Sequence, residues 1–575
     1  MKKNQIFVTI LFLVFIKIQG QVSVSKKLIS TYSNVDIENI FIQQNSNTLF
    51  SGEQLLYKVY CLNPDNSQGI SKIAYVELID ENKNSLFKHK IRLNAATGTG
   101  DYIIPFTLSS GNYKLIAYTQ WMRNAGATTF FQSDVDIINP FIADKIVVTE
   151  GDIAKTNSLI TNSTSKDIAL KLQKTTYTKR EKITLNIQAL NNESSFGNYT
   201  LSIRKVNQFA LPEKSTVINY KNQFKNSTIQ FSEQNNSYIV YPPEINGELI
   251  TGIVSKNNKP VANIKVALSI PSKTFVFKTA KTNKFGVFYF DLNNAYAGDN
   301  AIIQVSDNKK EKYTIKLTKS ATFDYSNLTF HKIKLSPKEF DFIKSKSEHV
   351  QIENAYRTVK QDSVYSTKPK VSFYNLDYNY VLDDFKRFPS VKETIVEVVD
   401  HTWITTKRGK HTFYVRDYKS TRKEGILPLI LIDGILVQDH QVLFDYDIKK
   451  IKAIGVITDK FLFENHLYGG VVSVETFNTD YTPITKGAYL KEFKLMKPID
   501  EKKYFEQSYQ DKEQFKNIPD FRSQLLWNPN LTINSKESEI SFYTSDNPGT
   551  YEIKLVGFTY KGEPITVTKT ITIKE

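Results

Sequence analysis

Cysteine is nearly absent from this 575-residue chain. The single Cys61 excludes an intrachain disulfide framework and a cysteine-rich metal site. It stands in the alternating segment "LLYKVYCLNP", which predicts a small buried residue rather than a reactive thiol. The seven histidines form no His-x-x-x-His pair, and no Gly-x-Ser-x-Gly, phosphate-loop or dinucleotide motif is present. The sequence therefore predicts no enzyme, no metal site and no cofactor.

Long hydrophobic runs are equally scarce. The only one is "IFVTILFLVFIKI", which follows the positive start "MKKNQ" and precedes a possible cleavage site after Gly20. This pattern is typical of a secretory signal peptide over residues 1–20 and is too short for a comfortable membrane span. We therefore expect a protein exported across the inner membrane, without a transmembrane span of its own. It would reside in the periplasm or be associated with the outer membrane or cell surface.

The chain is basic, but its positive charges are not concentrated in one segment. The formal net charge is +16, yet the lysines are scattered among Asp and Glu and form no long basic block. This distribution indicates an ordinary solvated surface and no nucleic-acid partner, with contact to acidic lipid or lipopolysaccharide as the second interpretation. Apolar residues make up 40% of the chain, which is enough to bury real cores.

Short alternating apolar runs, broken by Gly, Asn and Pro, dominate the chain from Val22 to about Ser320. This pattern predicts successive β-sandwich modules. The phrases "TLFSGEQLLYKVYCL" and "SGNYKLIAYTQWMRN" resemble a macroglobulin-type sandwich, as in shortened relatives of α2-macroglobulin from Bacteroidota-type bacteria. The resemblance implies such sandwiches at 21–140 and 141–243. A further linker and C-terminal sandwich are expected at 481–575, where "FYTSDNPGTYEIKLVGFTYKG" is similar.

The phrase "SGEQ" of residues 51–54 resembles the thioester motif of full macroglobulins, in which Cys precedes Gly-Glu-Gln. Here Ser51 stands in the place of that cysteine. An oxygen ester could not form by the same route, and the phrase lies in the wrong domain. Gly52 and Glu53 more simply make the turn into a strand. The sequence therefore predicts no thioester.

Residues 244–320 resemble a carboxypeptidase-regulatory-like domain. The phrase "TNKFGVF" fits the turn of these small sandwiches, in which Asn283 caps the turn, Gly286 takes a positive φ and Phe288 enters the core. Residues 321–375 are expected to form a helix and a linker, because Ser336 can serve as N-cap with Pro337 at the first helical position.

Residues 376–480 resemble the plug domain of TonB-dependent receptors. The phrases that carry the resemblance are "LILIDG", "DIKKIKAIGVITDK" and "YGGVVSVET". The long Gly-rich excursion of transporter plugs is lacking, and no energy-coupling peptide is found near the mature N-terminus. Only 95 residues follow residue 480, whereas a large barrel needs roughly 220 or more, so this chain is not itself the transporter. The predicted fold is mainly β: tandem immunoglobulin-like or macroglobulin-like sandwiches plus one small α+β plug-like domain.

Candidate functional residues are few. Trp121 and Arg123 could anchor a partner or close a strand end, and Asp433 and Tyr468 stand at turns of the plug-like segment; these four form the predicted interaction surface. The segment "DHQVLFDYD" could bind a cation, but its aspartates more simply cap a helix. His401 and His411 flank a predicted hairpin turn at Arg408-Gly409 without facing each other.

The favoured function is a non-catalytic exported scaffold. It would mediate protein–protein interaction at the outer membrane, as an accessory subunit that binds a β-barrel or another envelope protein. A periplasmic partner that gates a separate TonB-dependent transporter is one alternative. A macroglobulin-like protease trap or defence protein without the thioester is another, and a carbohydrate-binding or carbohydrate-degrading protein is a third.

Overall fold

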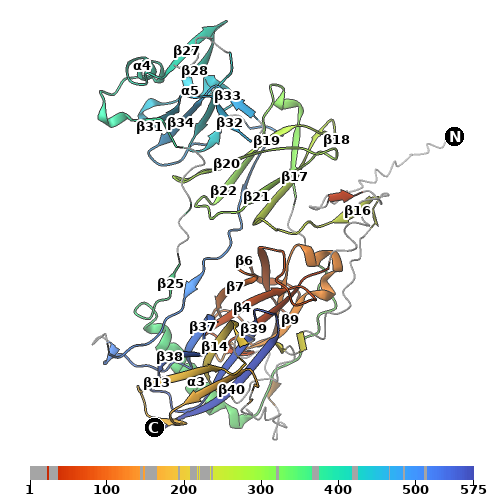
Figure 1. The fold of residues 1–575 in the computed structure, drawn as a ribbon, viewed down its shortest axis with the longest axis vertical. Helices are drawn as coiled ribbons and strands as arrows, with labels where there is room; N and C mark the ends of the chain where they lie inside the picture. Colours follow the sequence, from red (N-terminus) through yellow and green to blue (C-terminus); the bar gives the residue numbers. More distant parts are fainter. Residues whose placement is uncertain are drawn as a thin grey trace, which may run out of the picture.

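The computed structural model shows an elongated molecule of two lobes (Figure 1). It describes residues 22–24, 36–142, 147–148, 163, 165–191, 195–207, 216–217, 219–220, 233–234, 237–318, 323–365, 369, 375–416, 425–464, 466–483, 486–510 and 515–575. The predicted signal peptide and parts of the predicted linkers lie outside these residues. None of the helices in the described ranges is long and apolar enough to cross a membrane.

The first sandwich occupies the lower lobe next to the junction with the upper one (Figure 1). One sheet has the order β2 (Asn39–Gln44), β4 (Gln54–Leu62), β7 (Thr97–Ile103). The facing sheet runs β3 (Thr48–Phe50), β9 (Phe131–Ile138), β8 (Gly111–Tyr118), β5 (Ile73–Ile79), β6 (Ser85–Arg92). Cys61 is fully buried between them, as predicted. The short 3-10 helices η1 (Trp121–Ala125) and η2 (Ala127–Thr129) connect β8 to β9.

The second sandwich is built from two distant parts of the chain. One sheet has the order β11 (Ile168–Leu172), β13 (Lys182–Ala189), β38 (Glu537–Tyr543). The other runs β12 (Thr176–Tyr177), β40 (Pro564–Ile573), β39 (Gly549–Thr559), β14 (Gly197–Lys205), β37 (Gln524–Ile533). The prediction of separate sandwiches at 141–243 and 481–575 is therefore wrong, because each half supplies the pairing partners of the other.

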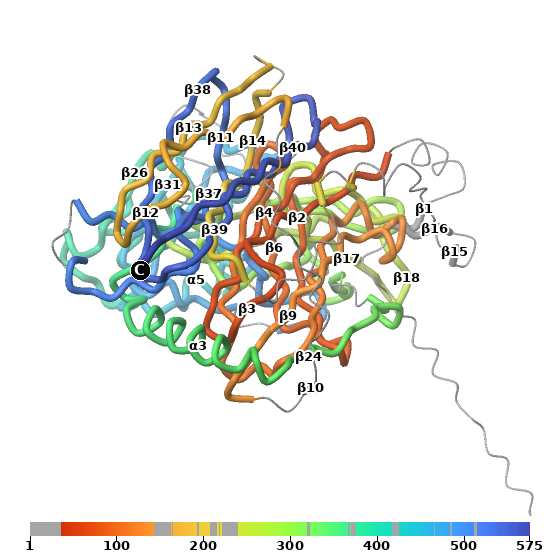
Figure 2. Tube along the Cα trace, turned by 90° about the horizontal axis from the view of Figure 1, so that it is seen from below, coloured from red at the N-terminus to blue at the C-terminus, as the bar shows by residue number. Residues whose placement is uncertain are grey.

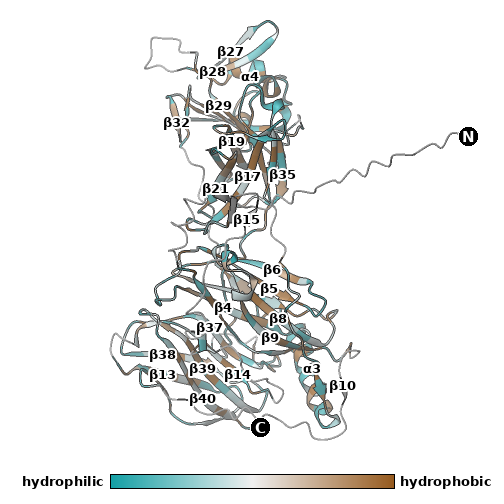
Figure 3. Ribbon diagram, turned by 90° about the vertical axis from the view of Figure 1, so that its right-hand side faces the viewer, coloured by the Kyte–Doolittle hydropathy of each residue, from teal (hydrophilic) through white to brown (hydrophobic). Residues whose placement is uncertain are grey.

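The third sandwich lies in the upper lobe. One sheet contains β18 (Lys259–Pro260), β17 (Glu248–Lys256), β21 (Val287–Leu292) and β23 (Thr314–Leu317). The other has the order β20 (Val276–Lys281), β19 (Lys265–Ile270), β22 (Asn300–Val305), β35 (Leu490–Lys494). A short 3-10 helix η4 (Lys310–Lys312) precedes β23. Figure 3 shows apolar residues along the strands of this sandwich.

The predicted turn of the third sandwich is confirmed. The Asn283 carboxamide oxygen accepts hydrogen bonds from the backbone N–H groups of Phe285 and Val287. Gly286 has φ 71° and Phe288 is fully buried. The likeness to carboxypeptidase-regulatory-like domains stays a prediction, and β35 enters this sandwich from beyond the predicted boundary.

An α+β unit forms the far end of the upper lobe. Its mixed sheet has the order β26 (Tyr378–Val381), β31 (Ile451–Ile457), β34 (Val471–Thr476), β29 (Leu429–Ile432), β30 (Ile435–Leu436). Its helices are α4 (Val391–Glu397), α5 (His440–Phe444) and the 3-10 turns η6 (Leu382–Asp384) and η7 (Ile448–Lys450). Two hairpins, β27 (Thr402–Lys407) with β28 (Lys410–Val415) and β32 (Phe461–Phe463) with β33 (His466–Tyr468), complete it. The α+β character is as predicted, whereas the plug likeness stays a prediction.

The helix predicted after residue 335 is present. Ser336 and Glu339 form a capping box with Pro337 in the first turn η5 (Pro337–Glu339), and α3 (Phe340–Ala355) follows. The helix lies beside β3 and β9 (Figure 2), where its apolar face packs on Phe50 and Ile138. It therefore belongs to the lower lobe and is not a free connector.

The described chain passes between the lobes four times, between β16 and β17, β23 and β24, β25 and β26, and β35 and β36. Short pairs of strands mark these passages: β1 (Val22–Val24) and β15 (Glu233–Gln234) with β16 (Ser237–Val240), β10 (Val147–Val148) with β24 (Lys334–Leu335), and β25 (Ser363–Val364) with β36 (Lys502–Lys503). The upper lobe is thus inserted between the two halves of the second sandwich.

The lobe junction contains buried acidic groups. Lys90 of β6 forms an ion pair with Glu248, the first residue of β17. The Tyr75 hydroxyl donates hydrogen bonds to Glu244, whose side chain also accepts the backbone N–H of Leu249. Burial raises the pKa of Glu244 to about 7. The junction therefore carries a group that titrates near neutral pH.

Candidate functional site

Of the predicted interaction residues, Trp121 is buried and Arg123 is occupied within the fold. Trp121 is 1% exposed, and its indole N–H donates to the backbone oxygen of Asp36. The Arg123 guanidinium lies over the Tyr241 ring at 3.6 Å and donates to Gln120. Trp121 is thus not an exposed anchor, and its role is to close the end of β8 against the preceding chain.

Asp433 and Tyr468 are also internal. Asp433 stands at the predicted tight turn and accepts hydrogen bonds from the backbone N–H and hydroxyl of Thr476 and from the backbone N–H of Tyr481. The Tyr468 hydroxyl accepts a 2.6 Å hydrogen bond from Lys265, which joins the α+β unit to the third sandwich. Both side chains are more than nine-tenths buried. The predicted surface position is wrong for them, because each satisfies partners inside the upper lobe.

Two aspartates of the segment "DHQVLFDYD", the alternative cation site, cap helices instead. Asp439 caps α5 through the N–H of Gln441, and Asp447 caps η7 through the N–H of Lys449. His440 accepts the backbone N–H of Phe413. Within the part of the chain that the structure describes, no three His, Cys, Asp or Glu side chains lie close enough together to hold a metal ion.

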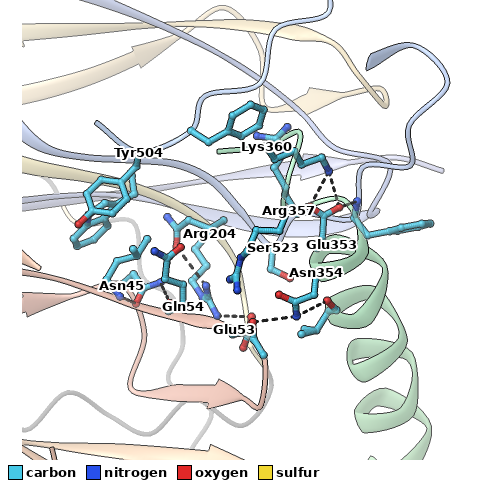
Figure 4. Close-up of a pocket in the computed structure, with 18 of the residues that line it drawn as sticks. Asn45, Glu53, Gln54, Arg204, Glu353, Asn354, Arg357, Lys360, Tyr504 and Ser523 are labelled. Carbon is cyan, nitrogen blue, oxygen red and sulfur yellow. Dashed lines mark hydrogen bonds and ion pairs between the residues drawn. The ribbon is translucent and has the colours of Figure 1, made fainter. Parts of the chain in front are cut away.

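A polar cavity of about 180 Å³ lies in the lower lobe (Figure 4). Its wall combines β4 and the turn before it, the end of α3, the passage around β36, and the segment that leads into β37. Both lower sandwiches, the helix and two passages between the lobes therefore converge here. No local sequence motif marks this convergence, since the contributing segments are hundreds of residues apart.

Glu53, from the phrase "SGEQ", is the centre of the buried charges beside this cavity. Its carboxylate accepts Arg204 of β14 at 2.9 Å, Lys346 of α3 at 3.0 Å and the backbone N–H of Phe50 at 2.8 Å. Burial alone would raise the pKa of Glu53, but Lys346 and Arg204 outweigh it and lower the pKa to about 2. One carboxylate thus links both sandwiches and the helix.

A second charged group closes the other side of the cavity. Glu353 of α3 pairs with Lys360 at 2.8 Å and accepts the backbone N–H of Phe521 at 2.6 Å. Arg522 is fixed by Asp520 at 2.7 Å. Burial would raise the pKa of Asp520, but Arg522 and Lys360 hold that pKa at about 2. These pairs keep the helix end fixed against the segment that precedes β37.

Two hydrogen-bond donors in the cavity wall are left over. Trp527 of β37 is 3% exposed, and among the described residues its indole N–H has no acceptor. The Arg357 guanidinium, in the turn after α3, has neither an ion pair nor a side-chain hydrogen bond within the described ranges. Burial lowers the pKa of Arg357, and Asp362 and Asp101 oppose this effect. A buried donor without an acceptor costs about 1–3 kcal/mol, so the Trp527 N–H is a candidate ligand contact, whereas Arg357 is only partly buried.

The upper lobe carries a different candidate, an open sheet edge. In the described sheet β26 pairs with β31, and no described strand pairs with its other edge. Tyr378 and Phe385 are 43% and 45% exposed. Tyr378 stacks on His401 at 3.6 Å, and Tyr380 donates to or accepts from the same ring at 2.6 Å. We call β26 together with Tyr378, Tyr380, Phe385 and His401 the edge surface.

Neither site is marked by a local sequence motif. Glu53 was assigned to a turn, and Gly52 does take φ 88° there, but the carboxylate has the larger role. The prediction that His401 is only a hairpin residue holds in part, since its ring stacks on Tyr378 in the edge surface. The alternation of tyrosines in "DYNYV" was the available signal for an edge strand with one aromatic face.

Comparison with known proteins gives distant structural likenesses. No family model and no curated relative matches the chain. The α2-macroglobulin of Salmonella reacted with methylamine has TM-score 0.24 and 8% identity, over 93% of this chain and 39% of that one. The Escherichia coli α2-macroglobulin activated by porcine elastase has TM-score 0.23 and 8% identity, over 93% and 44%. A CARDB domain from Pyrococcus furiosus, crystallised with two metal ions, has TM-score 0.14, 13% identity, and coverage of 18% and 90%. The chain spans about two-fifths of the length of the macroglobulins.

Proposed function

We propose that this protein is a non-catalytic scaffold of the bacterial cell envelope. It is exported across the inner membrane, and it binds an outer-membrane β-barrel or another envelope protein as an accessory subunit. The observation that carries the proposal is the edge surface at the end of the upper lobe. The signal-peptide pattern of residues 1–20 supports the location.

The edge surface has the properties of a strand-addition site. A free strand edge offers backbone N–H and C=O groups to an incoming strand, and folded proteins normally cover or block such an edge. Here the exposed side chains in and after β26 include the aromatic Tyr378 and Phe385, together with polar neighbours such as Asn379 and Lys386. Tyrosine and phenylalanine supply large contact areas at low entropic cost, so an extended segment of the partner would gain both hydrogen bonds and burial.

The rigidity of the lower lobe supports a scaffold role. The lower lobe is held by buried ion pairs that join the turn before β4 to β14 and α3, and four chain passages connect it to the upper lobe. Four covalent connections restrict the relative motion of the lobes more than a single linker would. The partner bound at the edge surface would therefore be held at a defined distance from whatever the lower lobe contacts.

The test is recovery of the partner from native membranes. The tagged full-length chain is extracted in mild detergent, and the co-purified proteins are quantified by mass spectrometry. We expect one envelope protein at a stoichiometric ratio. The double variant Tyr378→Ser with Phe385→Ser should lose roughly nine-tenths of it or more, because hot-spot aromatic residues dominate such interfaces.

The matched control is Tyr560→Ser. Tyr560 is 64% exposed in the turn between β39 and β40, in the other lobe, so the same kind of substitution should leave recovery unchanged. Recovery of the wild-type protein alone from the soluble fraction would refute the accessory-subunit proposal. A recovered TonB-dependent barrel whose transport, but not assembly, fails in the double variant would instead support the gating alternative.

A further inference from the structure

The polar cavity has a charge pattern that selects its ligand. Four cationic side chains and three carboxylates line it, so the formal charge of the lining is +1. Among these groups, Arg204 pairs with Glu53, Lys360 with Glu353, and Arg522 with Asp520 just outside the lining. In the described lining, Arg357 and Asp362 make no ion pair; Asp362 and Asp101 interact with Arg357 electrostatically. Lys346, just outside the lining, is a second cation on Glu53.

The carboxylates of the lining have no need of a cation from outside. Glu53 and Glu353 are held by the ion pairs given above. Asp362 accepts the backbone N–H of Phe505 at 2.9 Å and the side-chain amide of Gln54 at 3.4 Å. A bound metal ion or ammonium group would have to displace these partners. The groups of the wall that remain available to a ligand are therefore hydrogen-bond donors.

The spare donors come from two separate elements. Arg357 follows α3 and offers a planar fork of N–H groups, and Trp527 on β37 offers one indole N–H. Leu56 and Tyr504 pack with Trp527 in one apolar cluster at the same wall. A group that fits must accept hydrogen bonds at one end and present an apolar part at the other.

We propose that this cavity binds a small monocarboxylate, whose carboxylate pairs with Arg357 and accepts the Trp527 N–H while its apolar part lies on the Leu56, Tyr504 and Trp527 wall. Guanidinium and carboxylate are both planar and form two parallel hydrogen bonds. The cavity volume of about 180 Å³ equals that of about six water molecules at roughly 30 Å³ each, which suits a small acid.

Phosphate is disfavoured by the same geometry. It carries a charge between −1 and −2 at neutral pH, and Glu53, Glu353 and Asp362 all line the cavity. With Lys346 and Asp520 counted, five cations and four carboxylates surround the cavity, so the surplus balances one negative charge only. A neutral amide of the same shape would fill the space but place its own N–H groups against those of Arg357 or Trp527. The order of affinity should be carboxylate, then phosphate, then amide.

The experiment is calorimetric titration of the purified full-length chain at pH 7 and low salt. The probes are propionate and benzoate, with inorganic phosphate and benzamide for comparison. We expect saturable binding of at least one carboxylate, accompanied by a change in tryptophan fluorescence. Arg357→Gln should weaken it roughly tenfold or more, and Arg357→Lys somewhat less, because the charge remains while the fork is lost. Trp527→Phe should weaken it a few-fold and abolish the fluorescence change.

Arg416→Gln is the matched control. Arg416 is exposed at the end of β28 in the upper lobe, so this variant removes the same charge outside the cavity and should bind as the wild type does. Equal affinity of Arg357→Gln and wild type would overturn the proposal. So would tighter binding of phosphate or benzamide than of either acid, or no binding of either acid up to about 20 mM, which corresponds to a free energy too small for a specific site.

Discussion

Replacement of Glu53 by glutamine is the sharpest test of how the lower lobe is held together. The substitution keeps the shape of the side chain and removes its charge. Arg204 and Lys346, whose side chains are 11% and 8% exposed, would then share a neutral acceptor in a buried site. Breaking a buried ion pair by removing one partner commonly costs about 3–5 kcal/mol.

The shifted pKa gives an independent magnitude. The pKa of Glu53 falls from 4.5 to about 2, and each unit corresponds to about 1.4 kcal/mol, so the charged form contributes about 3 kcal/mol. Burial lowers the pKa of Lys346, and Glu53 opposes that effect. Without Glu53, Lys346 can lose its proton at lower cost, so we expect a destabilisation of about 3 kcal/mol, at the lower end of the range.

The sign of the pH dependence follows from the depressed pKa. The contribution of Glu53 is complete above its unfolded pKa of 4.5 and is lost as the pH falls toward about 2. Urea denaturation at pH 7 and at pH 3 should therefore show a gap between wild type and Glu53→Gln that narrows at the lower pH. Hydrogen exchange of β4 and β14 would place the loss in the lower lobe.

Glu475→Gln provides the control for this experiment. Glu475 forms an ion pair with Lys452 in which both side chains are 42% exposed, so its loss should cost less than about 1 kcal/mol. A loss of less than 1 kcal/mol in Glu53→Gln at pH 7 would refute the reasoning. It would mean that the two cations reach water or other acceptors once the carboxylate is gone.

Three further changes test other parts of the fold. The pKa of Glu244 is raised from 4.5 to about 7, so the protonated carboxyl stabilises the folded state below pH 4.5, and about 3 kcal/mol of this stability is lost by pH 7. Glu244→Gln should flatten the fall in melting temperature over that range. An unchanged profile of melting temperature against pH would contradict this. Gly434 has φ 80°, and a Cβ there would lie 2.2 Å from the Phe275 ring, whereas Gly409 has φ 74° and open space around it. Gly434→Ala should therefore cost about 2 kcal/mol more in urea denaturation than Gly409→Ala. Equal costs would show that the Phe275 ring moves aside freely. Asp433→Asn keeps one acceptor for three hydrogen bonds and should cost about 1–3 kcal/mol, seen as faster hydrogen exchange in β34, whereas unchanged exchange would remove its structural role.

Local features of the fold were predictable because their causes are local. The capping box at Ser336, the turn at Asn283 and the tight turn at Asp433 depend on residues within a few positions of one another. Side-chain caps and positive φ angles leave such short signatures in a sequence. The mainly β class followed from alternation in the same way.

The pairing of distant segments was not predictable, and this explains the errors about the second sandwich and the candidate residues. A half-buried strand such as β14 has the same alternation whichever strand it pairs with. Trp121 suits a surface or a core equally well until the acceptor at Asp36 is known. Glu53 gains its importance from Arg204 and Lys346, which lie far along the chain, so nothing around residue 53 indicated it.

The division of the second sandwich sets an order of assembly. Between the end of β14 and the start of β37 lie 318 residues, and β14 needs β37 and β39 on both of its edges. At ordinary rates of synthesis the C-terminal strands emerge on the order of 15 to 60 s after β14. During that interval one edge of β13 and both edges of β14 are unpaired and their apolar faces uncovered, which is the state in which chains aggregate or recruit chaperones. Completion of the lower lobe thus waits for β37 to β40, and a product truncated before β37 would be left unfinished and open to proteolysis.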